Sequence, residues 1–149
     1  MVRENGARLR VAYRIAGDLA RLRIPPPGAP GRTERLWEHT CCELFVGRRG
    51  EAAYHEFNFS PSGEWAAYAF SAYRSGAPAQ ATAPAIAVRV SGGLLELDVA
   101  VQAPADGALR IGLSVVIEEL SGTCSYWALR HPAGRPDFHH PEAFAAELA

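Results

Sequence analysis

The chain has 149 residues, 48% of them hydrophobic and 21% charged, with a formal net charge of −1 at pH 7. This size predicts one domain, residues 1–149, which can fold without a metal or disulfide. The balanced charge argues against nucleic acid or an anionic membrane as a partner. No apolar run reaches the ~20 residues of a membrane span and no signal-peptide core is present, so we expect a cytoplasmic location.

Alternating apolar and polar residues predict β-strands through the first half of the chain. Residues 8–15 form the first strand, and residues 19–24 are predicted to pair with it after a turn at Gly17 and Asp18. A Pro/Gly-rich loop, residues 25–31, ends this pair. The stretch from Leu36 to Tyr68 reads as three consecutive short strands.

The second half continues the same pattern. Residues 75–84 read as a loop, and a hairpin follows, with strands at 86–90 and 95–101 around a Gly-Gly turn. Residues 109–117 and 124–129 predict two further strands, whereas residues 141–148, with proline at the first position, predict a short helix. Many short strands separated by turns favour an all-β fold, an antiparallel β-sandwich with a short C-terminal helix.

Strand periodicity also predicts which side chains share a face. Cys42 should point between the sheets with Leu44 and Val46, leaving Glu43 on the outer face or at the rim. If residues 47–50 form a simple hairpin, Glu56 and Asn58 on the next strand should be neighbours of Glu43. Cys41 and Cys42 point to opposite faces, so three free thiols are expected.

Three segments resemble the DOMON-like domain proteins, bacterial relatives of DOMON domains and of family 9 carbohydrate-binding modules. They are LWEHTCCELFV (residues 36–46), EFNFSPSGEWAAY (residues 56–68) and SYWALRHPAGRPDFHHPEAF (residues 125–144). The resemblance implies two antiparallel sheets with a ligand at an open side or edge, and members of the wider superfamily bind sugars or haem. Members of this branch usually begin with a further apolar segment before the strand that starts here at Arg8.

The resemblance also implies a binding site. In the sugar-binding modules two tryptophans sandwich the sugar and a glutamate accepts hydroxyl hydrogen bonds, and Trp37, Trp127 and Glu43 stand where these roles are expected. Asn58 and Tyr126 are plausible polar additions. We therefore expect a non-catalytic module for a saccharide or similar small polar ligand, with no cofactor. The competing interpretation is that the tryptophans are core residues and Glu43 is solvated, and we assign Trp65 to the core.

A metal or haem site is one alternative. The segment from His131 to His140 holds imidazoles and Asp137, which suit zinc or iron, but its spacing matches no common ligand signature and Asp137 could simply cap a turn. Haem in relatives is held by methionine with histidine or lysine, whereas this chain has only Met1 and no lysine. A bis-histidine site remains open, drawn from His39, His55, His131, His139 and His140.

A carboxylate-based hydrolase is the other alternative. A glycosidase needs two carboxyl groups roughly 5–9.5 Å apart across a cleft. The candidates are Glu38, Glu43, Glu56 and Glu64. No nucleophile elbow, phosphate loop or metalloprotease helix accompanies them, so catalysis ranks behind binding.

Overall fold

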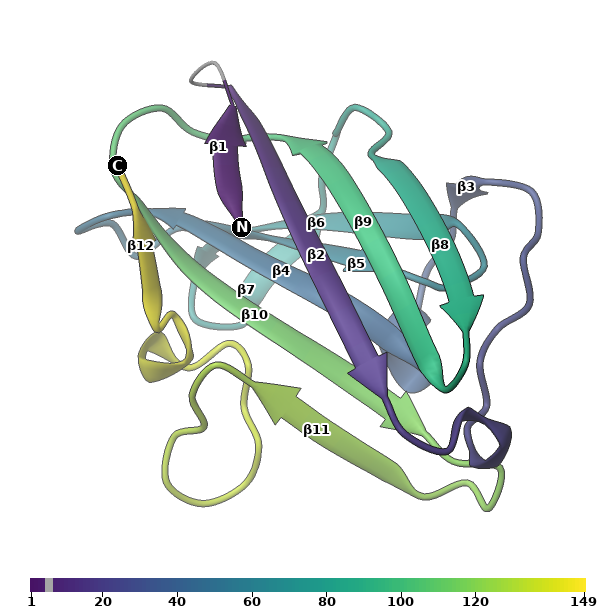
Figure 1. Ribbon diagram of the computed structural model, residues 1–149. Helices are drawn as coiled ribbons and strands as arrows, with labels where there is room; N and C mark the ends of the chain where they lie inside the picture. Colours follow the sequence, from purple (N-terminus) through teal and green to yellow (C-terminus); the bar gives the residue numbers. More distant parts are fainter. Residues whose placement is uncertain (5–6) are drawn as a thin grey trace.

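The computed structural model describes residues 1–4 and 7–149 and contains two β-sheets packed face to face (Figure 1). The smaller sheet has the strand order β1–β2–β9–β8, and every pair in it is antiparallel. Its strands are β1 (Val2–Glu4), β2 (Arg8–Ala16), β8 (Ala85–Ser91) and β9 (Leu94–Gln102). The short β1 therefore covers part of the edge of β2.

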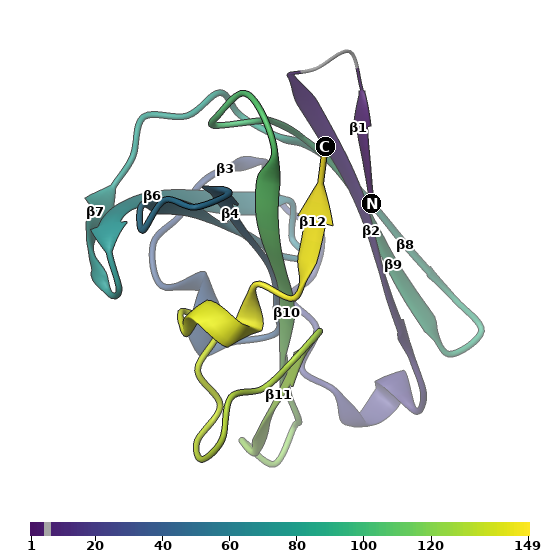
Figure 2. The ribbon, with the colours of Figure 1, turned by 90° about the vertical axis from the view of Figure 1, so that its left-hand side faces the viewer.

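The larger sheet has the order β11–β10–β4–β5–β6–β3, with β12 also paired to β10 and β7 to β6. Its strands are β3 (Gly31–Arg32), β4 (Cys41–Arg48), β5 (Tyr54–Phe59), β6 (Glu64–Ala72), β7 (Ser75–Pro78), β10 (Leu109–Glu118), β11 (Cys124–Ala128) and β12 (Ala146–Leu148). Among the described strands, only β3 pairs in parallel, with β6. Figure 2 shows the two layers side by side. The predicted β-sandwich is confirmed.

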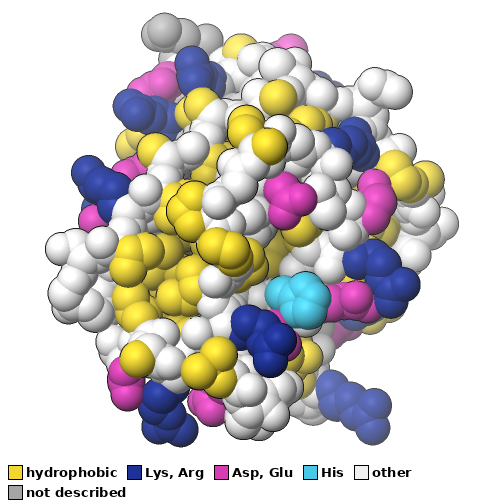
Figure 3. Space-filling model, turned by 90° about the vertical axis from the view of Figure 1, so that its right-hand side faces the viewer, with side chains coloured by type: hydrophobic (Ala, Val, Ile, Leu, Met, Phe, Trp, Pro, Cys, Tyr) yellow, Lys and Arg dark blue, Asp and Glu magenta, His cyan; other side chains and the backbone are white. Residues whose placement is uncertain are grey.

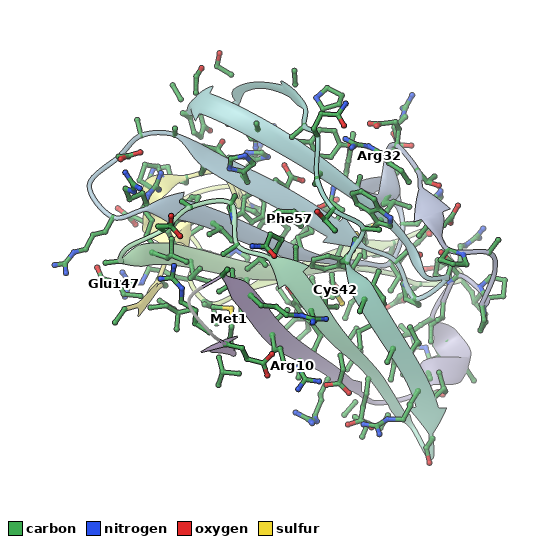
Figure 4. The ribbon with its side chains drawn as sticks, turned by 90° about the horizontal axis from the view of Figure 1, so that it is seen from above. Met1, Arg10, Arg32, Cys42, Phe57 and Glu147 are labelled. Atoms are coloured by element: carbon green, nitrogen blue, oxygen red, sulfur yellow. The ribbon has the colours of Figure 1, made fainter. Side chains whose placement is uncertain are left out.

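The main hydrophobic core lies between the sheets, as the alternation requires. Cys42, Leu44 and Val46 all belong to it, as predicted, and Trp65 does too. Figure 4 shows Cys42 and Phe57 between the layers and Arg10 on the outer side of the smaller sheet. All three cysteines are free thiols.

The core is less completely covered at one side of the sandwich. Ile24, Ile86 and Val88 pack against it but remain partly exposed. Figure 3 views the side on which β3 and β8 lie in Figure 1, and hydrophobic side chains gather over one half of that face.

Four local predictions were wrong. Residues 19–24 form a 3₁₀ turn, η1 (Leu19–Arg21), followed by one bridge from Leu22 to Glu119, and Trp37 lies in a second such turn, η2 (Leu36–Glu38). The predicted loop at residues 75–84 begins with β7. The predicted C-terminal helix consists only of η3 (Pro141–Ala143), because the next residues hydrogen-bond to the edge of β10 as β12.

Candidate functional site

The candidate site lies on the face of the larger sheet that is turned away from the core. Alternation places Glu43 of β4 and Glu56 of β5 on this face, since their neighbours Cys42, Leu44 and Phe57 point into the core. Glu43 pairs in register with Asn58, and Glu56 pairs with Phe45. The two carboxylates are therefore diagonal neighbours, as the predicted hairpin required.

The C-terminal segment between β11 and β12, residues 129–145, lies over part of this face, and we call it the cover. In Figure 2 the yellow segment around η3 lies beside the larger sheet, away from the smaller one. The rings of His139 and Phe144 both contact Phe45, with ring centroids 5.1 and 6.0 Å apart. A cavity of about 410 Å³ remains between sheet and cover. Its lining consists of Trp37, Glu43, Glu56, Tyr68, Phe70, Arg74, Val116, Tyr126, Pro136, Phe138 and His139.

Trp37 reaches the rim because of an unusual turn. Arg35 has a φ of +63°, in the left-handed region, and directs the chain into η2. Leu36 then packs in a small second cluster with Cys41, Ala66 and Tyr68, which holds η2 on the sheet. Trp37 is left 41% exposed, with its ring edge against Tyr68 at a centroid distance of 5.8 Å.

Glu43 is a buried carboxyl group with one side-chain hydrogen bond. It is 3% exposed, and Ser114 Oγ donates to its Oε2 at 3.1 Å. Burial, helped by the nearby charge of Glu56, raises the pKa of Glu43 to about 8, although the Ser114 hydrogen bond opposes the shift. Glu43 therefore carries a proton for much of the time near neutral pH.

Glu56 and His139 form the second polar pair of the cavity, with Nε2 of His139 3.5 Å from the carboxylate of Glu56. Burial raises the pKa of Glu56 to about 7, against the effects of the Asn58 amide and Arg74. Burial, together with the charge of Arg74, lowers the pKa of His139 to about 4. The imidazole is therefore neutral at physiological pH, and its Nδ1 is hydrogen-bonded to the Tyr54 hydroxyl at 2.8 Å.

Arg74 ties the cover to the sheet. Its guanidinium donates to Asp137 Oδ1 at 2.8 Å, and the Tyr73 hydroxyl donates to the other oxygen of the same carboxylate. Asp137 also accepts a hydrogen bond from the backbone N–H of His139 at 3.1 Å. Although partial burial opposes it, these contacts lower the pKa of Asp137. The charge of Arg74 is thus matched by Asp137.

The structure brings together only part of the predicted site. Trp37, Glu43 and Tyr126 line the cavity. Trp127 does not, because successive residues of β11 face opposite ways: its side chain shares a separate hollow with Leu22 and Ile117, and its indole N–H donates to Ser125 Oγ at 3.0 Å. The two tryptophans therefore do not face one common cavity, as the prediction required, because only Trp37 lines it.

Asn58 lies beside the cavity but does not line it. It shares the outer face with Glu43 and Glu56 and is fully buried; neither amide atom of its side chain makes a close hydrogen bond among the described residues, although the amide lies near enough to Glu56 to lower the pKa of that carboxyl. The strand alternation that located Glu43 also places Tyr68 and Phe70 on this face. No sequence signal identified Arg74 or Phe138, because they come from turns and loops, and the sequence pointed to His139 only as a candidate metal or haem ligand.

The arrangement of histidines and carboxylates bears differently on the two alternatives, a metal or haem site and a carboxylate-based hydrolase. The five histidines are dispersed: His39 binds Glu118, His55 packs beside Phe57, and the His140 ring caps η3. Within residues 1–4 and 7–149, no three His, Cys, Asp or Glu side chains converge as a metal site requires. Of the candidate hydrolase carboxylates, only Glu43 and Glu56 line the cavity. Glu38 pairs with Arg35, and Glu64 accepts from Thr33 and Ser62.

Comparison with known proteins supports the architecture. No family model and no curated protein matches the chain. The fold is similar to the crystal structure of a Bacteroides uniformis protein named "putative carbohydrate-binding protein", with a TM-score of 0.69 and 17% sequence identity. The alignment covers 93% of this chain and 71% of that one. At such low identity the likeness establishes the fold alone.

Within residues 1–4 and 7–149, no helix has the length and apolar character needed to cross a membrane.

Proposed function

We propose that the chain is a non-catalytic binding module, formed by residues 1–149, for a saccharide or a similar small polar ligand. The observation that carries the proposal is a cavity lined both by aromatic rings, of which Trp37 and Tyr126 are exposed, and by the carboxyl groups of Glu43 and Glu56. The fold shared with the named Bacteroides uniformis protein and the DOMON-like resemblance support the same ligand class.

The chemistry of the cavity suits such a ligand. Sugar rings present flat C–H faces that pack on aromatic planes, here Trp37 and Tyr126, while carboxyl groups hydrogen-bond to hydroxyls. A protonated carboxyl both donates and accepts, so Glu43 can serve either role. The cavity volume of about 410 Å³ falls in the usual range of small-molecule pockets.

Hydrolysis is the second candidate, for one reason: two carboxyl groups with raised pKa values share the cavity. Incubation with nitrophenyl glycosides separates the two functions. Saturable binding without turnover supports the module, whereas turnover that Glu43→Gln abolishes would replace it with an enzyme.

The binding test is a glycan array followed by fluorescence titration of the hits. Trp37→Ala should weaken binding at least about fivefold, because a stacked aromatic contributes on the order of 1–3 kcal/mol. Trp127→Ala is a matched control, since Trp127 is even more exposed, at 60%, but lies outside the cavity. Equal losses in the two variants, or no response to any glycan, would contradict the proposed function.

A further inference from the structure

The floor of the cavity carries acidic groups with no cation of their own. Among the described residues that line it, Arg74 is the only basic side chain apart from the neutral His139, and Arg74 is bound to Asp137 at 2.8 Å. Ser114 supplies Glu43 with only a neutral donor. Buried carboxyl groups are normally paired with a cation or hydrogen-bonded several times over. Here Glu43 has no cation beside it, and the charge of Arg74, which acts on Glu56, is shared with Asp137.

The walls have the chemistry that attracts a cation. Trp37, Tyr68, Phe70, Tyr126 and Phe138 all border the cavity. Aromatic faces carry partial negative charge and bind ammonium groups, most strongly where water is excluded. A neutral polyol could pack on such faces and hydrogen-bond to the carboxyl groups beneath them, but it would supply no positive charge to balance them when they are ionised.

Asn58 adds a further polar side chain to the floor of the cavity. It is fully buried on the same sheet face, opposite Glu43 in the strand register, and its amide makes no close hydrogen bond among the described residues, although it lies near enough to Glu56 to lower the pKa of that carboxyl. Unsatisfied buried amides are rare in folded proteins. The polar side chains beneath the cavity therefore include Asn58 as well as the two carboxyl groups.

We propose that the cavity binds an organic ammonium group, carried by an amino sugar or by a simpler small amine, between the carboxylates of Glu43 and Glu56 and against the aromatic walls. This inference rests on the proposed function, because it names the class of ligand that the same cavity takes.

Proton linkage gives the proposal a signature that neutral ligands lack. The raised pKa values of Glu43 and Glu56 mean that a cation must displace protons as it binds, so its affinity rises with pH. The other titratable groups that face Glu43 and Glu56 do not reverse this rise of cation affinity with pH. The pKa of His139 is lowered, so it is already neutral, Arg74 stays paired with Asp137, and burial raises the pKa of Tyr68 well out of range.

The experiment titrates the whole chain, by tryptophan fluorescence and calorimetry, with four probes at pH 6 and pH 8. The probes are glucosamine, N-acetylglucosamine, glucose and tetramethylammonium, whose charge does not change with pH. Tetramethylammonium should bind about tenfold more tightly at pH 8, with proton release measured in buffers of different ionisation enthalpy. Glucosamine should bind at least about tenfold more tightly than its neutral N-acetyl analogue at pH 6. A response to tetramethylammonium alone would identify a simple amine as the ligand source.

Substitutions of single residues test whether the pH dependence of cation binding arises from the carboxyl groups on the cavity floor. Glu43→Gln and Glu56→Gln should each reduce the pH dependence and weaken cation binding about tenfold. Glu38→Gln, an exposed carboxylate on η2, should change neither. If a variant does not fold, the pH comparison on the unmodified chain still decides.

Two results would overturn the inference. Glucose or N-acetylglucosamine binding as tightly as glucosamine would leave the proposed function intact and refute the ammonium site. Affinity for tetramethylammonium that falls or stays constant from pH 6 to pH 8 would refute it as well. Absence of binding by any saccharide, with or without an amine, would instead count against the proposed function.

Discussion

At the scale of single residues, Glu43 is the most unusual position. It lies in β4, where seven consecutive residues, Cys41 to Gly47, are buried, so the strand is covered on both faces. An ionisable group at the centre of such a strand raises the free energy of the folded state whenever it is charged. Its presence therefore fits a binding role better than a structural one.

The first prediction concerns the pH dependence of this residue. Groups whose pKa is raised on folding contribute stability at low pH and lose it as pH rises through the folded-state pKa. The free energy of unfolding should therefore fall between pH 6.5 and pH 8.5, driven by Glu43 and Glu56. His139 opposes this fall only near pH 6.5, where the unfolded imidazole is still about half protonated, and adds nothing above about pH 7.5.

Glu43→Gln should remove part of this fall. At pH 8.5 we expect the variant to be more stable than the unmodified chain by about 1–3 kcal/mol, since each pKa unit corresponds to about 1.4 kcal/mol. At pH 5 the two should differ by less than about 1 kcal/mol. Urea denaturation at both values measures this. A variant that is less stable at pH 8.5 would show that the ionised carboxylate is well solvated.

At the scale of elements, the segment from β11 to β12 forms the cover of the site with little regular structure. Its ends are fixed by pairing with the same strand, β10, and Phe144 stacks against the guanidinium of Arg110 at 4.1 Å. Between these anchors, Asp137 is the residue that ties the segment to Tyr73 and Arg74.

The second prediction tests this tie. Asp137→Asn should cost less than about 1 kcal/mol of global stability, as partly exposed ion pairs do. It should nevertheless increase amide hydrogen exchange in residues 130–140 and weaken ligand binding several-fold, because the cover opens locally. Asp98→Asn, which removes a surface ion pair with Arg89 on the smaller sheet, is the control and should change neither. Unchanged exchange in the Asp137 variant would show that ring packing alone holds the cover.

At the scale of the whole molecule, stability and binding are separated by the larger sheet. One face of β4 and β5 supplies the main core and the other supplies the cavity. The hydrophobic contribution therefore comes chiefly from residues that no ligand touches.

The third prediction follows from this separation. Leu97 of β9 is fully buried between the sheets, so Leu97→Ala should destabilise the fold by about 2–5 kcal/mol. Ligand affinity, measured well below the melting temperature, should change less than about twofold. A cost under about 1 kcal/mol, or a large loss of affinity, would contradict the separation.

The sequence alone determined the strands and the faces of their residues. Period-two alternation is a local property, so the long strands, the Gly92–Gly93 hairpin and the outward position of Glu43 could be predicted from neighbouring residues. The same rule would have shown that Tyr126 and Trp127 face opposite ways.

The tertiary structure decided everything that depends on contacts between distant segments. Residues 75–78 and 146–148 became strands because open sheet edges offered hydrogen bonds, not because of their own pattern. The cavity likewise exists because β10, β4, β5 and β6 lie side by side and the segment carrying His139 folds over them. That meeting is set by strand order and packing, and burial in turn shifted the pKa values of Glu43, Glu56 and His139.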